Sequence, residues 1–186
     1  YERAGRVTCL GADQRVGALT AVGAVSPPGG DLSEPVTQST LRIVKVFWSL
    51  DASLAYARHF PAINWLLSYS LYLDNIEEYI RKNLGDEWIK MRTDSMRLLQ
   101  EESELQEIVR LVGVDALSPR ERLTLETAKS LREDFLLQNA FHEVDTYCSL
   151  EKQKRMIQLI MVLHQECQRA LEKDAELEKL LALPVR

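Results

Sequence analysis

Histidine and cysteine residues lie close together at two places in the sequence, and both residue types bind transition metals. His164 and Cys167 are three residues apart, about one turn of a helix, and His142, Asp145 and Cys148 follow the same spacing. Zinc sites need three or four ligands, and the glutamine and glutamate residues around Cys167 offer little. We therefore predict no metal site, and we interpret Cys167 as a small buried core residue.

Motifs that position phosphate groups or a nucleophile are absent from the sequence. It contains no GxxxxGK(S/T) or GxGxxG loop, and no GxSxG or HExxH motif. Gly29 and Gly30 in the string SPPGGD could cradle a phosphate, but a loop that requires positive φ angles is the simpler interpretation. We therefore predict no catalytic residues within this chain.

The aromatic residues have structural interpretations when they are considered alone. Trp65, Tyr69 and Tyr72 form a cluster that is typical of packing at a domain junction. Phe60 and Phe141 are, on the same grounds, interpreted as core aromatic residues. From the residues alone, an interaction or mechanical role is favoured over enzymatic chemistry.

The composition excludes several classes of protein. The 186 residues are 46% hydrophobic and 27% charged, which is ordinary for one folded domain or two small ones. The net charge of −5 and the pI of about 5.3 disfavour nucleic acid as a partner. No apolar run approaches the ~18–20 residues of a membrane span, so we expect no direct membrane insertion. The three widely spaced cysteines fit a reducing compartment, and the opening at Tyr1, without Met, predicts a piece of a longer protein.

Glycine and proline divide the chain near residue 61, with a turn-rich part first and a helix-rich part after it. Six of the eight glycines lie in residues 1–30, and four of the six prolines lie in residues 1–61. The first part predicts strands at 6–10 and 18–25, whose sheet partners we expect upstream of this chain. A loop at 26–35 and a helix from Val36 to about Trp48 follow.

The second part predicts a helical bundle. A short helix is expected at 74–83, and a long one from Asp86 to about Val112. The apolar stripe of the long helix changes sides, so either one helix packs on two sides or a break falls near 100–104. Its early side carries Ile89, Met96 and Leu99, and its late side carries Leu105, Ile108, Val109 and Val112.

The later helix ends are well marked. Gly113 is typical of a C-cap, and Ser118, Pro119 and Glu121 form a capping box that starts a helix to about Gln138. Ser149 caps a last long helix through Cys167, and 172–181 adds a turn or two.

Five segments closely resemble the catalytic A subunit of V/A-type rotary ATPases, in the order and at the spacing of that family. The segments are YERAGRV (1–7), GAVSPPGGDLSEPVTQSTLRIVKVFWSLD (23–51), RHFPAINWLLSYSLY (58–72), ESELQEIVRLVG (102–113) and QNAFHEVDTYC (138–148). The last segment, QNAFHEVDTYC, looks like the archaeal and bacterial branch of the family.

The resemblance implies a mostly α chain with two parts. Residues 1–65 would be the C-terminal end of a P-loop α/β nucleotide-binding domain, contributing its last strands, loop and helix, and residues 66–186 the C-terminal helical domain. The family's P-loop lysine, magnesium ligand and catalytic glutamate would all precede Tyr1. The intact subunit would use ATP or ADP with Mg, whereas this fragment alone would be inactive and would bind no cofactor.

The resemblance also implies the setting of the chain. It would be part of a proton- or sodium-translocating ATPase or ATP synthase, peripheral on the cytoplasmic side of the cell membrane. In that family, A and B subunits alternate in a hexamer around a central-stalk rotor. Two alternatives remain: a stand-alone α-helical adaptor, and a relative such as the non-catalytic B subunit or a secretion-system ATPase. The strings SPPGGD and HFPAINW favour the A subunit over both relatives.

Two functional regions follow from the resemblance. In the related F-type beta subunit, aromatic residues from two distant segments flank the adenine, and the matching positions here are Phe60 and Phe141, with Pro61 holding the backbone at Phe60. The second region is a helical hairpin that contacts the rotor. It departs from the acidic F-type pattern at Pro119, Arg120 and Arg122, so a steric contact is expected there rather than an electrostatic one. The predicted rotor-contacting residues are Asp115, Ala116, Leu117, Ser118, Pro119, Arg120 and Glu121.

Overall fold

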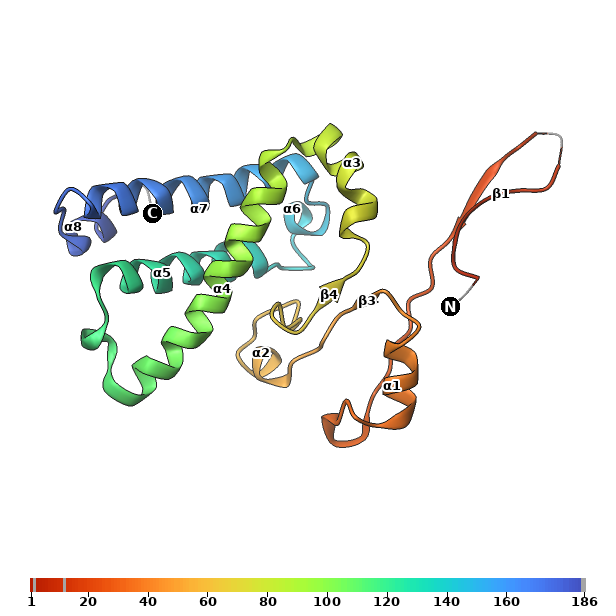
Figure 1. Ribbon diagram of the computed structural model, residues 1–186, viewed down its shortest axis with the longest axis horizontal. Helices are drawn as coiled ribbons and strands as arrows, with labels where there is room; N and C mark the ends of the chain where they lie inside the picture. Colours follow the sequence, from red (N-terminus) through yellow and green to blue (C-terminus); the bar gives the residue numbers. More distant parts are fainter. Residues whose placement is uncertain (2, 12, 185–186) are drawn as a thin grey trace. The chain divides into compact units, whose positions relative to one another are not determined.

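A computed structural model describes residues 1, 3–11 and 13–184 of the chain (Figure 1). The chain forms two compact units. The N-terminal unit consists of Tyr1–Phe47 with Tyr69–Tyr72, and the helical unit consists of Trp48–Ser68 and the chain from Leu73 onward. The chain is mostly helical, as the sequence predicted, and its few strands are short.

The N-terminal unit begins with a two-stranded antiparallel ribbon. Strand β1 (Gly5–Thr8) pairs with β2 (Val16–Leu19), so that Gly5 lies opposite Leu19 and Thr8 opposite Val16. Both strands are shorter than predicted, the second one begins earlier than expected, and the two pair with each other. The expectation of further partners upstream of this chain stays a prediction. Nearly all their side chains are exposed, including those of Val7, Val16 and Leu19. The ribbon therefore buries little apolar surface within this chain.

The helix predicted from Val36 to about Trp48 is wrong in its second half. After the 3-10 turn η1 (Pro28–Gly30), helix α1 (Pro35–Leu41) begins where the Glu34 carboxylate accepts a hydrogen bond from the Thr37 amide. The chain then extends, and β3 (Val46–Phe47) pairs antiparallel with β4 (Tyr69–Ser70). The β-branched residues of this stretch favour extended backbone, and the Phe47 ring packs on Tyr69 with centroids 5.8 Å apart.

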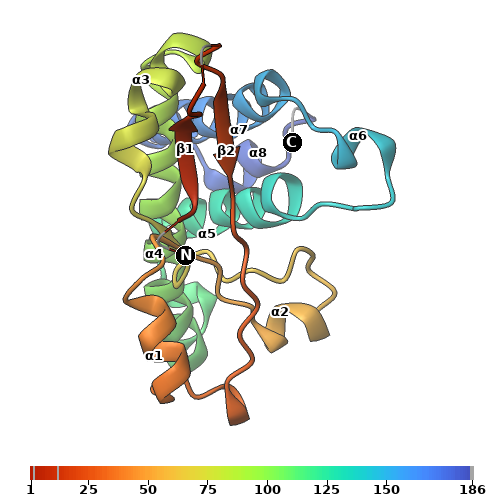
Figure 2. The same cartoon turned by 90° about the vertical axis from the view of Figure 1, so that its right-hand side faces the viewer.

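The helical unit contains the longer elements, and Figure 2 shows its helices from a second direction. Among the described residues, no helix is both long and apolar enough to cross a lipid bilayer. The elements are α2 (Ala52–Tyr56), α3 (Leu73–Leu84), α4 (Glu87–Val112), the 3-10 turn η2 (Val114–Ala116), α5 (Pro119–Ser130), the π-helix η3 (Leu131–Leu136), α6 (Glu143–Thr146), α7 (Leu150–Leu171) and α8 (Leu177–Leu181).

Helices α4, α5 and α7 enclose the main core of this unit. Its buried residues include Leu98 and Leu99 from α4, Ala128 from α5, and Ile157 and Met161 from α7. A second apolar cluster joins α5, α7 and α8 through Leu123, Cys167 and Leu177, and the predicted burial of Cys167 is confirmed. Both apolar clusters therefore lie entirely within the helical unit.

The ends of these helices follow the caps in the sequence. Gly113, with a φ of 86°, ends α4. Both bonds of the capping box between Ser118 and Glu121 are present at the start of α5, and the Ser149 hydroxyl accepts from the Lys152 amide at the start of α7. Helix α4 is continuous, so the break considered near 100–104 does not occur.

Candidate functional site

Two segments far apart in the sequence meet within the helical unit. The amide of Gln138 donates a hydrogen bond to the carbonyl oxygen of Phe60 at 2.7 Å. The ring of the preceding residue, His59, donates through Nε2 to the carbonyl of Arg132 at 2.8 Å. These two bonds join the segment that carries Phe60 to the segment that leads to Phe141.

Neither aromatic residue of this region is a core residue of the chain. The Phe60 side chain is 50% exposed and that of Phe141 is 99% exposed, and Pro61 is exposed as well. The interpretation of both rings as core aromatics is therefore wrong. Two exposed rings are free to stack on a planar, apolar ligand.

The loop that carries Phe141 is held by its own polar groups. The Asp145 carboxylate accepts from the Asn139 amide at 3.0 Å, and the Asn139 side chain accepts from the Phe141 amide. The bond from the Asn139 amide, with the nearby Lys152 charge adding to it, lowers the pKa of Asp145. Helix α6 follows at once, with His142 as its N-cap. The loop has a defined shape although its phenylalanine points away from the core.

The predicted rotor-contacting residues lie on the turn between α4 and α5, but not all of them face outward. Leu117 is buried. The Glu121 carboxylate accepts hydrogen bonds from the hydroxyl and the amide of Ser118, and these bonds lower the pKa of Glu121. Arg120 pairs with Glu172 at 2.9 Å, so its charge is matched within the chain. The charged side chains of Arg120 and Glu121 therefore contact the chain itself, whereas Asp115 is exposed.

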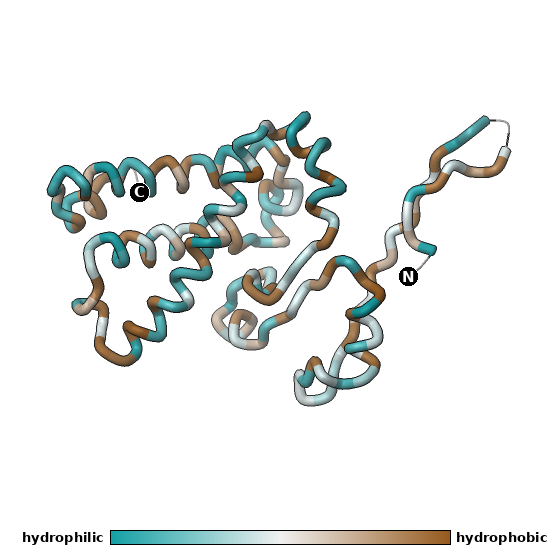
Figure 3. The backbone as a smooth tube through the Cα atoms, viewed as in Figure 1, coloured by the Kyte–Doolittle hydropathy of each residue, from teal (hydrophilic) through white to brown (hydrophobic). Residues whose placement is uncertain are grey.

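An apolar surface beside that turn was not assigned from the sequence. The last two turns of α4 and the start of η2 leave four large apolar side chains exposed, and the turn is brown at the lower left of Figure 3. Leu111 is the most exposed of the four, with 84% of its surface accessible. The late side of the apolar stripe included two of these residues, Ile108 and Val112, although the pattern did not say whether other parts of the chain would cover them. We name these residues the hairpin surface: Ile108, Leu111, Val112 and Val114.

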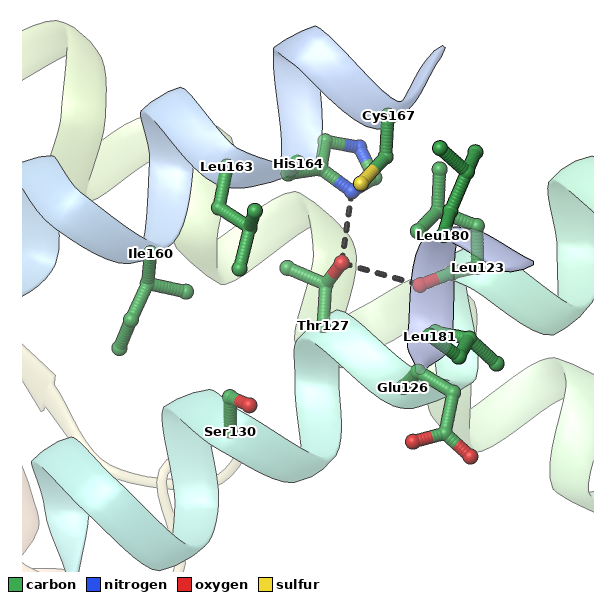
Figure 4. A pocket seen from close by; sticks show the side chains of 10 residues that line it. All are labelled: Leu123, Glu126, Thr127, Ser130, Ile160, Leu163, His164, Cys167, Leu180 and Leu181. Atoms are coloured by element: carbon green, nitrogen blue, oxygen red, sulfur yellow. Dashed lines mark hydrogen bonds between the residues drawn. The ribbon is translucent and has the colours of Figure 1, made fainter. Parts of the chain in front are cut away.

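A small, partly open pocket of about 50 Å³ lies between α5, α7 and α8 (Figure 4). The Thr127 hydroxyl donates to the Leu123 carbonyl, so the His164 Nδ1–H donates to Thr127, at 2.7 Å. Burial lowers the pKa of His164 and favours its neutral form. No described group of three or more His, Cys, Asp or Glu side chains is arranged to hold a metal ion.

Two family models match the chain. The ATP synthase alpha/beta family, nucleotide-binding domain, matches residues 1–70. The C-terminal domain of V and A type ATP synthase matches residues 77–181, which is more than half of the chain. Both matches agree with the resemblance found in the sequence, and they favour it over a stand-alone adaptor.

Similar proteins point the same way. The V-type ATP synthase alpha chain of Thermoanaerobacter pseudethanolicus is 69% identical over all 186 residues, and that of Clostridium novyi is 65% identical over 183 residues. The chain spans about a third of these relatives, 32% and 31%.

Among solved structures, the ATP synthase subunit NeqB from Nanoarcheaum equitans has the same fold. It aligns with a TM-score of 0.68 over 80% of this chain and 36% of that one, at 23% identity. Fold, family models and relatives agree, and the chain belongs to the V and A type ATP synthase family.

Proposed function

We propose that this chain is part of the catalytic subunit of a V- or A-type, proton- or sodium-translocating ATPase or ATP synthase. Within that subunit it contributes an adenine pocket at Phe60, Pro61 and Phe141, and a helical domain that contacts the rotor. The intact subunit alternates with B subunits in a hexamer around a central-stalk rotor. The assembly lies peripherally on the cytoplasmic side of the cell membrane.

The observation that carries the proposal is the bond from the Gln138 amide to the Phe60 carbonyl. It brings together two segments whose aromatic residues are 81 positions apart, and it leaves both rings exposed. Exposed aromatic rings can stack on an adenine base, which offers two π faces. ATP, with Mg, supplies the phosphoanhydride bond that the intact subunit breaks or forms. This chain's own part is to bind the base, and alone it has no ATPase activity.

The adenine pocket is tested by Phe60→Ala and Phe141→Ala in the full-length subunit. Stacking on a base contributes ~1–3 kcal/mol, so ATP binding should weaken by roughly tenfold or somewhat more. The rings stabilise ground and transition states alike, so KM should rise more than kcat falls. Tyr56→Ala, an exposed aromatic residue on the neighbouring helix α2, is the matched control and should leave KM unchanged. A loss of melting temperature with unchanged affinity in the folded protein would assign both rings to packing.

The hairpin surface supports a steric contact with the rotor. Its exposed side chains are apolar, whereas the nearby Arg120 is already paired within the chain. Replacing Leu111 and Val114 with serine, or residues 115–121 with alanine and glycine, should reduce coupling in the intact complex more than nucleotide affinity. Arg120→Gln should matter less. If that charge change alone abolished coupling, the contact would be electrostatic.

A further inference from the structure

Arg132 forms bonds in two directions from one turn of the helical unit. Its carbonyl oxygen accepts from the His59 ring at 2.8 Å and from the Leu137 amide at 2.9 Å. Its guanidinium meets the Glu102 carboxylate of α4, with Nε 3.1 Å from both carboxylate oxygens and Nη2 2.8 Å from one. A single residue therefore connects the Phe60 segment to the middle of α4.

The ion pair between the Arg132 guanidinium and the Glu102 carboxylate holds Arg132 in a fixed position relative to α4. Glu102 is only 5% exposed, and the Arg132 side chain is 26% exposed. Two-pronged contacts between a guanidinium and a carboxylate are stronger and more directional than single ones. Gln106 also donates to Glu102 at 3.3 Å. A buried carboxylate that lost its partner would be strongly unfavourable, so Arg132 and α4 are expected to move together.

The backbone hydrogen bonds between Arg132 and the Phe60 segment depend on the π-helix η3. In an α-helix, the Arg132 carbonyl would accept from the residue four positions later, but here it accepts from Leu137, five positions later. The same carbonyl is shared with His59, and the next amide in the chain, that of Gln138, bonds the Phe60 carbonyl. Single π turns occur frequently at functional sites. This π turn provides two hydrogen bonds to the segment that ends in Phe60: one from the His59 ring to the Arg132 carbonyl and one from the Gln138 amide to the Phe60 carbonyl.

The other end of α4 carries the hairpin surface. Glu102 lies ten residues before Val112, which is about 15 Å along a helix that rises 1.5 Å per residue. A displacement at the hairpin surface would travel along this continuous helix to Glu102, then through Arg132 to His59 and Phe60. The described contacts thus include a bonded path between the two regions of the proposed function.

We propose that Arg132 is a positioning residue for nucleotide binding, held by Glu102 so that the Phe60 ring stays where the base needs it. His59 transmits this constraint from the Arg132 carbonyl to the Phe60 segment. The proposal rests on the proposed function, because it assigns to Arg132 a role at the adenine pocket.

The test uses the full-length subunit in its complex and the double variant Glu102→Leu/Arg132→Met. Replacing a buried ion pair with apolar residues of similar size is often neutral for stability, so the protein should fold with a similar Tm. Equilibrium binding of ADP should weaken by about fivefold or more, since coupled residues commonly interact on that scale. Amide hydrogen exchange should rise in residues 58–62 and 138–146. Arg132→Lys keeps the charge without the two-pronged contact and should restore part of the affinity.

A matched double variant controls for the loss of any pair on α4. Glu87→Leu/Lys154→Met removes the 2.8 Å pair between α4 and α7, which has no bonded link to His59 or Phe60. It should leave ADP affinity and the exchange of those segments unchanged. An equal loss of affinity in this control would overturn the assignment of Arg132.

The remaining outcomes separate this inference from the proposed function. If Phe60→Ala does not weaken ADP binding, the adenine pocket itself is wrong. If Phe60→Ala weakens it but the Glu102/Arg132 variant binds ADP normally, with or without a lower Tm, Arg132 is only structural. Should the double variant fail to fold, the single variant Glu102→Gln takes its place. Weakened ADP binding by that variant would support the positioning role, and normal ADP binding would mean that Arg132 is only structural.

Discussion

The apolar side chains of the N-terminal unit face outward along β1 and β2, whereas those of the helical unit face one another between α4, α5 and α7. In the N-terminal unit, Val7, Val16 and Leu19 are exposed on a ribbon of four-residue strands. In the helical unit, Leu98 and Leu131 are almost completely buried. Burial of apolar surface is the main favourable term in folding, so the two units differ in what can hold them together.

The difference explains where each unit finds its stability. A two-stranded ribbon is marginal by itself, so the N-terminal unit requires surface from another segment or another chain to cover its apolar residues. The helical unit has a core of its own, closed by caps at Gly113, Ser118 and Ser149. It is therefore suited to move as one body.

The largest expected effect comes from dividing the chain into residues 1–47 and 48–186, which leaves only Tyr69–Tyr72 of the N-terminal unit in the second polypeptide. Residues 48–186 should fold alone and unfold cooperatively on heating, because the main core and its caps all lie within that range. Residues 1–47 alone should show no cooperative transition. Circular dichroism melts of both polypeptides measure this. A cooperative transition in residues 1–47 would break the comparison.

A second prediction compares one leucine from each unit. Leu98→Ala should lower the free energy of unfolding by about 2–5 kcal/mol, because it leaves a cavity in a packed core. Leu10→Ala removes a fully exposed side chain and should change it by no more than about 0.5 kcal/mol. Denaturant titrations of both variants check the contrast, and a large loss from Leu10→Ala would show that the N-terminal unit has a core after all.

The sequence predicted the elements whose causes are local. Gly113, Ser118 with Glu121, and Ser149 act within one helical turn, so their caps can be read directly from the sequence. Elements with distant causes were missed. Strand β3 exists because it pairs with β4 more than twenty residues later, and η3 shares its Arg132 carbonyl with a histidine 73 residues away. No periodicity within a short window contains that information.

The residues of the candidate site also differ in whether they could be predicted from the sequence. Phe60 and Phe141 were assigned from the family resemblance, and their role at a base stays a prediction, as does a domain boundary at residue 65. Ile108 and Val112 of the hairpin surface belong to the late apolar side of α4 that the sequence showed, whereas Leu111 and Val114 do not. Exposure also depends on which elements pack against that side. Glu102 and Arg132 gave no local signal, because their pairing depends on how α4 and η3 pack.

A third prediction concerns His164, whose pKa is lowered by burial. Desolvation of His164, with Arg97 of α4 adding to it and Asp94 and Glu101 opposing, places its pKa below the ordinary 6.5. The unfolded chain then binds the proton more tightly, so the stability of the helical unit is complete above about pH 6.5 and falls as the pH drops below it. One proton limits the slope to about 1.4 kcal/mol per pH unit.

The matched variant for this pH dependence is His164→Gln. It keeps a polar group near Thr127 but cannot titrate, so its unfolding free energy should fall less than that of the parent chain between about pH 7.5 and pH 5. Denaturant titrations across this range measure the difference. Equal pH dependence in the two proteins would assign the acid sensitivity to other groups.

The smallest expected effect tests whether surface charges help the core to hold the helical unit together. Arg120 and Glu172 form a 2.9 Å pair, and both side chains are more than half exposed. Such pairs contribute about 0–1 kcal/mol, because water screens the charges and both side chains lose rotamer freedom. Arg120→Gln should therefore shift Tm by no more than about 3 °C, far less than Leu98→Ala. High salt should shrink the shift further by screening the pair. A shift as large as that of Leu98→Ala, undiminished by salt, would mean that this link, and not the core alone, stabilises the turn after α4.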